Sequence, residues 1–478
     1  MLPLLLALGA VGAPPPAAPP PTSPDERASA APPSAPSPPR PRDDDDDDDA
    51  EGKVAPGSPL VVTGRRLDAA RTGIDAALGA TLYALSNDAI ENRPGGETGR
   101  IAQILAQAPG VAVQGDAIAI RGTRAVQLRI NDVIVPEAVR DPQERLGTRL
   151  AETTRLLTGT LPAQFGFAPG GVVSVTTKSG LYAHGGQAEL FAGNRGFVEP
   201  AAEWSGSVGG ASLFASGSLE RGRAILAAAD GAEGRDTRRE AGALAFADLL
   251  LGPHDRVSLL LGGSDERHRI DGTGLGPGVE HGSAGYAVGT FQHSDDGLSL
   301  QASLFAAVAT DRVRFRTAGR ERRRSFGTQI DATQSLGARN TLRAGLLASH
   351  AGESETDPLL PGSHAGRTPL ALYVQDEWKI APALTFNPGV RAEWLRGPAR
   401  QAKLEPRASL VWAAGDDVTA HAGYSRYAAA PPLRAARAAD LPDEADDYYD
   451  VGAQRRTGPL HARRRPLLAC RAGPARRA

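Results

Sequence analysis

The sequence predicts a small α/β domain followed by an antiparallel transmembrane β-barrel of about fourteen strands, incomplete at its C-terminal end. Two observations support this fold class. Apolar residues recur at every second position from about residue 185 to 457, which is the period of a strand with one apolar face. Short turns alternate with longer polar segments along the same stretch, as in outer-membrane barrels, whose periplasmic turns are short and whose extracellular loops are long.

Composition excludes several classes of function. Lys and Arg number 53 against 55 Asp and Glu among 478 residues, so no overall positive charge favours nucleic acid. One cysteine and nine scattered histidines, without an H-E-x-x-H or C-x-x-C motif, indicate no disulfide, no metal site and no cofactor. The sequence contains no arrangement of a nucleophile and a base that would suggest an enzyme. Beyond the first dozen residues, no apolar run approaches the ~18–20 residues of a membrane helix.

The N-terminal segments predict export and a linker. Residues 1–13 contain an apolar run of signal-peptide length followed by small residues, although no basic residue precedes the run and Pro14 leaves the cleavage site open. Residues 14–58 are rich in Pro and Ala and include seven consecutive aspartates, Asp43 to Asp49. We expect a solvated, self-repelling linker there, with a calcium site as the weaker alternative.

Residues 59–180 predict the compact α/β domain. An amphipathic helix is expected over residues 98–108 because Ile101, Ile104 and Leu105 share one face before Pro109-Gly110. Asn131-Asp132 fits a tight turn, since both residues tolerate positive φ. Further expected elements are short strands at 61–63, 111–113, 117–121 and 126–130, a helical stretch near 149–157, and a strand over 170–177.

Residues 181–457 predict the barrel strands. In residues 202–208, Ala202, Trp204 and Val208 alternate with polar side chains, and residues 298–304 repeat the pattern. Each strand is expected to have about the 9–11 residues that cross a bilayer at a tilt. Longer loops are expected near 220–238, 265–284, 310–324, 351–367 and 428–446. The alternative, a soluble all-β protein, predicts shorter strands and no alternation of turn length.

The C-terminal residues differ in composition. Residues 455–478 contain eight arginines, no acid and the single cysteine of the chain. We therefore expect residues 458–478 to be an Arg-rich tail outside the barrel, produced by a frameshift or truncation, with a basic tail that binds lipid or nucleic acid as the alternative. A sheet that stops at about fourteen strands has two unpaired edges, which are costly in hydrocarbon.

Several motifs, in this order, resemble the TonB-dependent outer-membrane receptors. Leu60-Val61-Val62-Thr63-Gly64 is similar to the TonB box of that family, Ile120-Arg121-Gly122 to the core of its plug domain, and the segment around Gly170-Gly171 to the closing strand of the plug. Residues 371–378 and 405–412 are similar to strands of its barrel. The resemblance covers about residues 55 to 455, but plugged outer-membrane transporters have about 22 strands, more than we count here.

The resemblance implies a location in the outer membrane of a Gram-negative bacterium, among its lipid and lipopolysaccharide. The implied function is active uptake of a scarce extracellular small molecule, possible ligands being a ferric siderophore or another anionic nutrient. The periplasmic TonB protein would add a strand to Leu60, Val61, Val62, Thr63 and Gly64 and pull on the plug that blocks the lumen. Residues 14–58 leave no room for a folded signalling domain.

One arginine-rich segment is a candidate ligand loop. Seven arginines fall between residues 312 and 324, and their forked guanidinium groups suit carboxylate or phosphate. They are Arg312, Arg314, Arg316, Arg320, Arg322, Arg323 and Arg324. The alternative is that this loop meets lipopolysaccharide phosphates or stays solvated. Arg121 is expected to be structural, pairing within the plug or with the barrel.

Two alternative functions stay open at this stage. The first is an outer-membrane barrel with a structural or adhesive role, which predicts no binding between TonB and residues 58–66. The second is a truncated copy without function. A soluble secreted β-rich enzyme ranks last, because no nucleophile motif with a plausible context is present.

Overall fold

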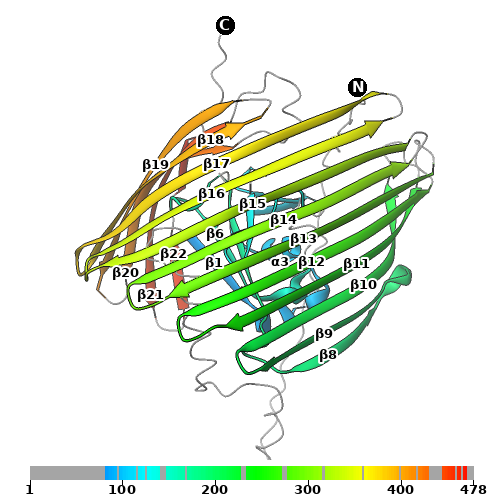
Figure 1. Cartoon of the computed structure of the whole chain (residues 1–478), viewed down its shortest axis with the longest axis horizontal. Coiled ribbons are helices and arrows are strands. Elements are labelled where there is room, and N and C mark those ends of the chain that lie inside the picture. Colours follow the sequence, from blue (N-terminus) through cyan, green and yellow to red (C-terminus); the bar gives the residue numbers. More distant parts are fainter. Residues whose placement is uncertain are drawn as a thin grey trace, which may run out of the picture.

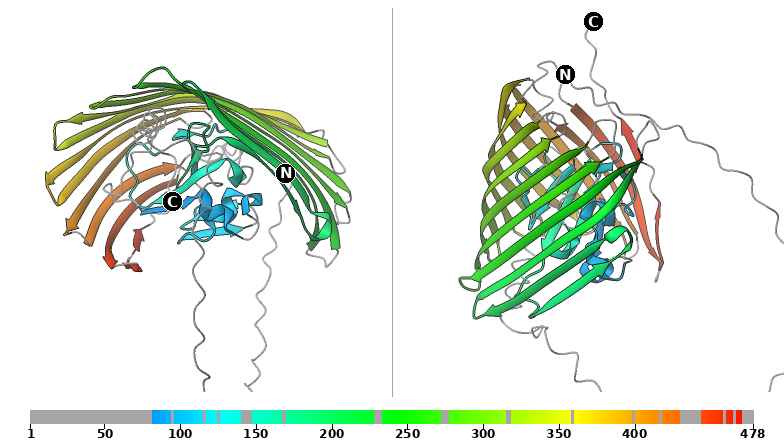
Figure 2. Two further views of the ribbon diagram at one scale, coloured as in Figure 1. Left: turned by 90° about the horizontal axis from the view of Figure 1, so that it is seen from below. Right: turned by 90° about the vertical axis from the view of Figure 1, so that its right-hand side faces the viewer.

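The chain folds into a small α/β domain that lies against the concave side of one large curved sheet (Figures 1 and 2). The computed structural model describes residues 81–93, 96–114, 117–123, 126–139, 147–166, 170–227, 233–271, 277–314, 318–357, 360–397, 400–415, 418–429, 444–457, 460–464 and 467–470. The expected signal-like segment 1–13, the linker 14–58 and the motif 60–64 lie outside these residues. We call the small domain the plug and the large sheet the wall.

The plug contains a five-stranded sheet in the order β1-β6-β7-β4-β5 and a separate β2-β3 hairpin. β4 and β7 pair in parallel, and the other neighbours are antiparallel. The elements are β1 (Thr81–Ser86), α2 (Asn87–Glu91), η2 (Gly96–Thr98), α3 (Ile101–Leu105), β2 (Val111–Gln114), β3 (Ala117–Ile120), β4 (Val126–Ile130), β5 (Val133–Ile134), η3 (Thr148–Leu150), β6 (Ala151–Thr158) and β7 (Gly171–Thr177).

The helices of the plug are shorter than the sequence predicts. The expected helix 98–108 is reduced to α3, whose Ile101, Ile104 and Leu105 are buried as predicted. The expected helical stretch near 149–157 is wrong, because it forms η3 and then β6. β6 lies between β1 and β7, and its β-branched Thr153-Thr154 suits a strand that is paired on both sides. β1 was not expected.

The predicted turn and the glycine entry to β7 are confirmed. Asn131 and Asp132 have φ values of 50° and 61° and connect β4 to β5. The Asn131 side chain accepts a hydrogen bond from the Thr177 backbone N–H (3.0 Å), which joins this turn to the end of β7. Gly171 has φ of 140°, and a Cβ there would lie 2.7 Å from the Leu157 carbonyl oxygen, so a side chain is excluded.

The wall is a 16-stranded sheet that runs in sequence order from β8 to β22, with β23 also paired to β21. Fourteen strands, β8 to β21, precede residue 458, which confirms the expected number. They are β8 (Gly185–Ala192), β9 (Val198–Val208), β10 (Ala211–Ala227), β11 (Glu233–Leu250), β12 (Asp255–Asp271), β13 (Gly278–Ser294), β14 (Leu298–Arg314), β15 (Ala318–Leu336), β16 (Asn340–Asp357), β17 (Leu360–Ala381), β18 (Leu384–Arg396), β19 (Gln401–Ala414), β20 (Val418–Ala429) and β21 (Glu444–Thr457), with η4 (Asn194–Gly196) between β8 and β9.

Two details of the wall differ from expectation. β10 to β17 contain 17–22 residues each, not 9–11, because antiparallel pairing continues through most of the segments that we expected to be loops. The segments β22 (Leu460–Arg464) and β23 (Leu467–Cys470) pair with β21, although we expected a tail outside the barrel. Among the described strands, β8 and β22 end the sheet and are not paired with each other, and Figure 2 shows the open curve.

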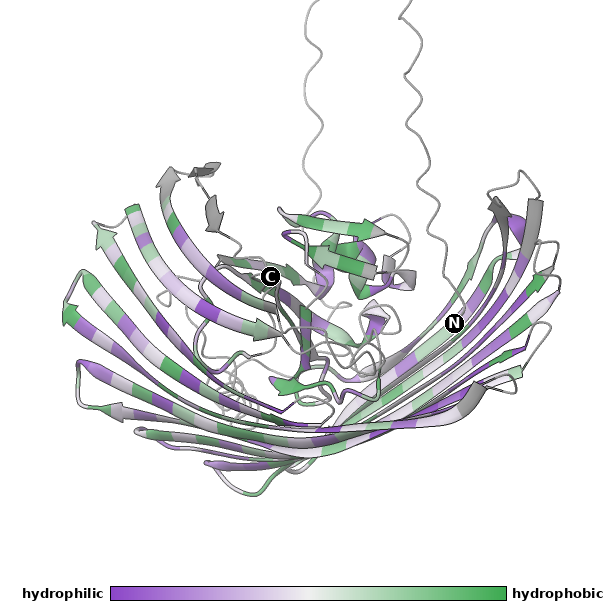
Figure 3. Cartoon of the chain, turned by 90° about the horizontal axis from the view of Figure 1, so that it is seen from above, coloured by the Kyte–Doolittle hydropathy of each residue, from purple (hydrophilic) through white to green (hydrophobic). Residues whose placement is uncertain are grey.

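The polarity of the wall identifies its environment. Large apolar side chains point away from the plug and are exposed, including Leu190 (70%), Val208 (87%) and Leu304 (69%). Charged and amide side chains face the plug and are buried, and Figure 3 shows the alternation along each strand. This arrangement is the reverse of a soluble sandwich and fits a sheet whose outer face meets lipid. Within the described residues, no helix is long and apolar enough to cross a membrane.

Candidate functional site

The candidate functional site is the contact between the plug and the wall, because buried charged side chains of the wall, Arg323 and Arg407 among them, bond the plug backbone there. We name three parts of it. The latch is plug residues Gly159–Gly166, between β6 and β7, with the side chains of β17 to β20 that bind them. The turn contact joins residues 131–138 to β14, β15 and β17. The ion-paired seam joins plug residues Arg100, Arg149 and Lys178 to β11, β8 and β9.

Arg407 of β19 is the centre of the latch. Its Nη1 donates to the carbonyl oxygens of Pro162 (2.6 Å) and Phe165. Its Nη2 donates to the Glu405 carboxylate at 2.7 Å, and its guanidinium carbon lies 4.6 Å from the centre of the Tyr427 ring. Since Arg407 is buried, these contacts replace the water that its charge would otherwise require.

Glu405 and Arg407 belong to a charged quartet on β18 and β19. Arg391 and Glu393 form the second pair, with Nε to Oε1 at 2.5 Å, and Arg391 lies opposite Glu405 in the antiparallel register. All four residues are buried. A Cβ at Gly166 would lie 2.1 Å from the Nε of Arg391. The absence of a side chain at Gly166 therefore lets the plug backbone approach the quartet.

Two neutral side chains complete the latch. The Tyr427 hydroxyl accepts a hydrogen bond from the Leu161 N–H (2.6 Å) and donates to the Gly159 carbonyl oxygen (2.8 Å). Gln375 of β17 accepts from the Ala163 N–H at 2.7 Å. The backbone of this plug segment is thus satisfied by wall side chains at both donors and acceptors, as buried polar groups require.

The turn contact uses the same chemistry on β15. Gln329 accepts from the Ile134 N–H (3.1 Å) and donates to the Asp132 carbonyl oxygen (3.0 Å). Ser325 accepts from the Ala138 N–H (3.0 Å), and Arg323 donates to the Ala138 carbonyl oxygen (3.1 Å). The turn is therefore fixed by specific hydrogen bonds to its backbone.

The ion-paired seam is different in kind. Glu97 binds Arg149 (3.1 Å) and Lys178 (2.8 Å) inside the plug. Lys178 then reaches Glu203 of β9 at 2.9 Å, and Arg149 reaches Glu189 of β8 at 2.8 Å. Burial raises the pKa of the Glu97 carboxyl above its usual value, and its hydrogen bond from Lys178 opposes this shift. The seam joins charged side chains to charged side chains, whereas the latch bonds wall side chains to the plug backbone.

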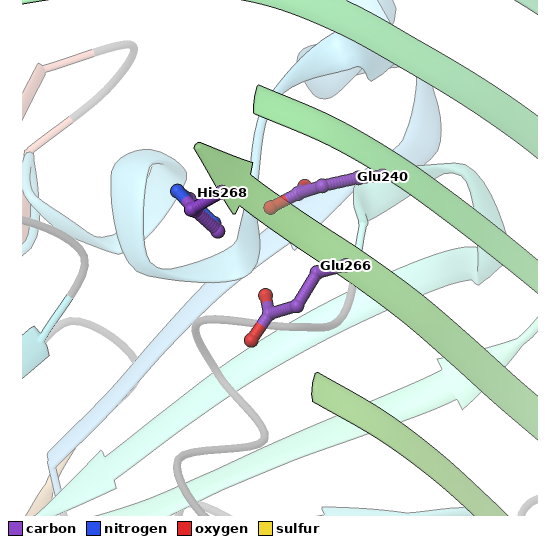
Figure 4. A group of neighbouring side chains, drawn as sticks. All are labelled: Glu240, Glu266 and His268. Carbon is purple, nitrogen blue, oxygen red and sulfur yellow. The ribbon is translucent and has the colours of Figure 1, made fainter. Parts of the chain in front are cut away.

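A second charged group lies on the inner face of β11 and β12. Carboxylate and imidazole atoms of Glu240, Glu266 and His268 all lie within 4.8 Å of one another (Figure 4). Glu240 also forms an ion pair with Arg100 of the plug (2.6 Å) and with Arg238. We assign this group to the seam, because guanidinium groups already bind its central carboxylate.

The predicted plug motif is structural in this fold. Ile120 ends β3 and is buried, Arg121 adopts φ of 51°, and Gly122 follows with φ of 85°. The Arg121 backbone N–H donates to the Gly110 carbonyl oxygen (2.8 Å), and its side chain donates to Thr158 (3.3 Å). Gly170 precedes β7. Arg121 pairs within the plug, as expected.

The arginine-rich candidate loop is not a loop. β14 extends to Arg314 and β15 begins at Ala318, so six of the seven arginines lie on paired strands and Arg316 lies outside the described residues. Arg323 faces the plug and binds Asp311 (2.7 Å) and Glu321 (2.8 Å). The other five are exposed and lie on the outward positions of the two strands: Arg312, Arg314, Arg320, Arg322 and Arg324.

The residues that hold the plug were not predicted from the sequence. Arg391-x-Glu393 and Glu405-x-Arg407 are charged pairs on the inward positions of neighbouring strands, and that spacing was a usable signal. Gln375 and Tyr427 carried no signal, because an isolated polar residue on a polar face is common. Glu240 and His268 come from different strands, so no linear metal motif could identify the group in Figure 4.

Comparisons with known proteins agree with this geometry. Residues 280–459 match the family described as TonB dependent receptor-like, beta-barrel, and no curated protein matches the sequence. A mutant of the ferric enterobactin receptor PfeA from Pseudomonas aeruginosa is similar, with a TM-score of 0.66 and 15% identity over 82% of this chain and 71% of that chain. The outer membrane transporter YddB from Escherichia coli has a TM-score of 0.64 and 14% identity over 79% and 67%. The copper transporter OprC has a TM-score of 0.67 and 15% identity over 80% and 69%.

Proposed function

We propose that this chain, a TonB-dependent outer-membrane receptor by its fold and by the barrel sequence of residues 280–459, imports a scarce small ligand through a lumen that the plug gates. The observation that supports this most strongly is the latch. A folded domain lies against the inner face of the wall and is held by hydrogen bonds that can break and re-form. Such a domain serves as a gate, and its contacts set the work needed to open it.

In this proposal, the periplasmic TonB protein supplies the force. It adds a strand to Leu60, Val61, Val62, Thr63 and Gly64, where main-chain pairing gives affinity. These residues lie outside the described part of the chain, and the proposal for them rests on the sequence motif alone. A pull on this segment enters the plug from its N-terminal side, where β1 begins at Thr81.

We propose only the chemical class of the ligand. The five outward arginines lie on the lipid-facing side and do not support an anionic ligand in the lumen. The inward positions of β11 to β14 instead carry Asp236, Glu240, Glu266, Glu280 and Asp311. The titles of similar structures name copper, a cation, and ferric enterobactin, an anionic complex. The acidic inward positions favour the cation, so copper is our first probe and ferric enterobactin is the contrasting one. We propose that the chain is a transporter and not an enzyme.

Uptake by cells tests the proposal. The full chain is expressed in Escherichia coli that lacks its own enterobactin receptors, and uptake of radioactive ferric enterobactin and of copper is measured with and without TonB. We expect uptake that requires TonB and that Val62→Pro abolishes, because proline removes a backbone donor from the added strand. Ala50→Pro in the linker is the matched control. Insertion of the barrel without TonB-dependent uptake of either probe would favour the structural or adhesive alternative.

A further inference from the structure

The inner face of the wall carries glutamates that lie directly opposite one another. In the antiparallel register, Glu220 of β10 pairs with Glu240 of β11, and Glu240 pairs with Glu266 of β12. The register of β9 and β10 places Glu199 beside Glu220. We call these four residues the acidic row. Like charges directly opposite one another destabilise a sheet, so the row gains stability when a cation lies between its carboxylates.

The acidic row faces the plug and is only partly covered by it. Its members alternate along their strands with exposed outward residues such as Arg239 and Arg267. The side chain of Glu240 keeps 20% of its exposure, and that of the neighbouring His268 keeps 22%. An ion of atomic size can therefore reach these side chains without displacing the whole plug.

One carboxylate of the row has no bonding partner within the described part of the chain. Glu199 is 5% exposed, and its Oε2 atom is buried without a hydrogen bond. The negative charges of Glu220 and Glu240 act on it, opposed by the positive charge of Arg149. A buried polar group without a partner is costly, so this carboxylate points to a cation that comes from outside the chain.

A histidine completes a set of metal-ligating atoms in the middle of the row. One atom each of Glu240, Glu266 and His268 lies within 4.8 Å of the other two, and Figure 4 shows the three side chains turned toward one another. Metal bonds of about 2.0–2.2 Å hold two ligand atoms at most about 4.4 Å apart. Small side-chain rotations therefore suffice to bring all three atoms onto one ion.

Asp236 holds the imidazole in the form that binds a metal. Its carboxylate accepts a hydrogen bond from Nδ1 of His268, at 3.2 Å, which leaves the lone pair on Nε2. Metal-binding histidines commonly donate their other ring N–H to a carboxylate in this way. Two carboxylates and one imidazole suit a divalent ion such as Cu²⁺ or Zn²⁺.

The plug supplies a cation that competes for the same carboxylate. Arg100 binds Glu240 at 2.6 Å. A metal ion on Glu240 and the Arg100 guanidinium repel each other, so each weakens the binding of the other by the same factor. Occupation of the site therefore loosens the seam at Arg100.

We propose that Glu240, Glu266 and His268 bind a divalent transition-metal ion. Asp236 positions the imidazole, and Arg100 of the plug competes with the ion. The inference rests on the proposed function in one respect, since it names the metal ion as the imported ligand. Binding at the site itself requires neither TonB nor transport, so the two can be tested separately.

Copper titration of the full chain tests the site. The natural chain, purified in detergent without an affinity tag, is titrated with Cu²⁺ against a chelator of known affinity, and electron paramagnetic resonance is recorded. We expect coupling of the copper to an imidazole nitrogen. Loss of an outer partner of a metal ligand costs about 10–100-fold in affinity, so Asp236→Asn should bind at least about ten-fold more weakly with the coupling retained. His268→Gln should bind at least about 100-fold more weakly and lose the coupling.

Two further variants complete the experiment. His293→Gln is the matched control, because His293 also bonds a carboxylate, that of Asp255 at 2.8 Å, but lies at the short-turn end of β13. It should bind copper as the natural chain does. Arg100→Gln should bind copper more tightly, because the competing cation is gone.

Three results would overturn the inference. The first is a natural chain whose bound copper shows no imidazole coupling, a measurement that needs no variant to fold. The second is equal affinity in His268→Gln and His293→Gln. The third, unchanged affinity in Arg100→Gln, would remove the competition with the plug. Copper binding as expected, without TonB-dependent uptake by cells, would contradict the proposed function and support the site.

Discussion

The plug is attached to the wall in two chemically different ways, and the contrast suggests how such a domain is released. At the latch, buried wall side chains bond the plug backbone between Gly159 and Gly166. At the ion-paired seam, plug charges meet wall charges through Lys178 and Arg149. The first contact depends on one backbone geometry, whereas the second tolerates small shifts of both partners.

The two contacts also differ in their place along the chain. One seam contact, from Arg100 to Glu240, follows β1 closely, whereas the other two start from Arg149 and Lys178, which lie before and after the latch in the sequence. A pull from the N-terminal side therefore loads the contact of Arg100 before it loads the latch. The seam side chains are largely buried, so breaking these ion pairs costs more than breaking exposed ones. We infer that the contact of Arg100 yields first, while Arg149, Lys178 and the latch keep the rest of the plug anchored.

The largest expected effect comes from Arg407→Met. The substitution removes the bonds to Pro162 and Phe165 and leaves Glu405 buried without its partner. Breaking one side of a buried ion pair costs about 3–5 kcal/mol. Hydrogen exchange of residues 159–166 should then be at least about 100-fold faster, because 1.4 kcal/mol corresponds to a factor of ten.

Arg343→Met is the matched control for that variant. Arg343 forms an ion pair with Glu377 inside the wall, at 3.5 Å, and none of its described contacts reaches the plug. It should weaken the wall while leaving exchange in residues 159–166 unchanged. If both variants accelerate exchange there equally, the latch does not depend on Arg407 and the contrast with the seam fails.

A smaller effect is expected from Tyr427→Phe. The ring remains in its apolar cluster with Leu161 and Phe165, but the Leu161 N–H loses its acceptor. A buried donor without a partner costs about 1–3 kcal/mol, so exchange at Leu161 should be about ten-fold faster. Tyr424→Phe, which loses a bond to Asp447 within the wall, should leave Leu161 unchanged. Exchange at Leu161 that stays at the natural rate in Tyr427→Phe would show that the hydroxyl does not hold the plug.

Much of this architecture could be predicted from the sequence, and the failures have physical causes. The period of two along the wall and the Asn131-Asp132 turn are local patterns, and they were predicted correctly. The stretch 149–157 was assigned to a helix because its preference for a strand comes from pairing with β1 and β7, which lie far away in the sequence.

The direction of the side chains in the arginine-rich hairpin also depends on strand pairing that the local sequence does not show. The seven arginines between 312 and 324 were visible as a cluster, but their direction depends on strand register. A loop would present them together, whereas β14 and β15 send Arg323 inward to Ala138 and Arg320 outward. The latch was missed because Arg407 and Tyr427 contact residues more than 240 positions away, and no single sequence reveals such pairs.

The smallest expected effect concerns the seam and its dependence on pH. Burial holds the pKa of Glu97 above its usual 4.5, so the folded plug binds this proton more tightly than the unfolded chain does. The stability contributed by this group is then greatest below pH 4.5 and falls as pH rises to the raised pKa, beyond which it is constant. Exchange of residues 97–105, corrected for the intrinsic effect of pH, should accelerate over that interval, and Glu97→Gln should abolish the acceleration.

Two controls accompany this measurement. Glu91→Gln, at an exposed position on α2, should retain the acceleration. Residues 159–166 should show no such slope, because the latch does not contact Glu97. A slope that persists in Glu97→Gln would assign the titration to another group and would leave the seam without this difference from the latch.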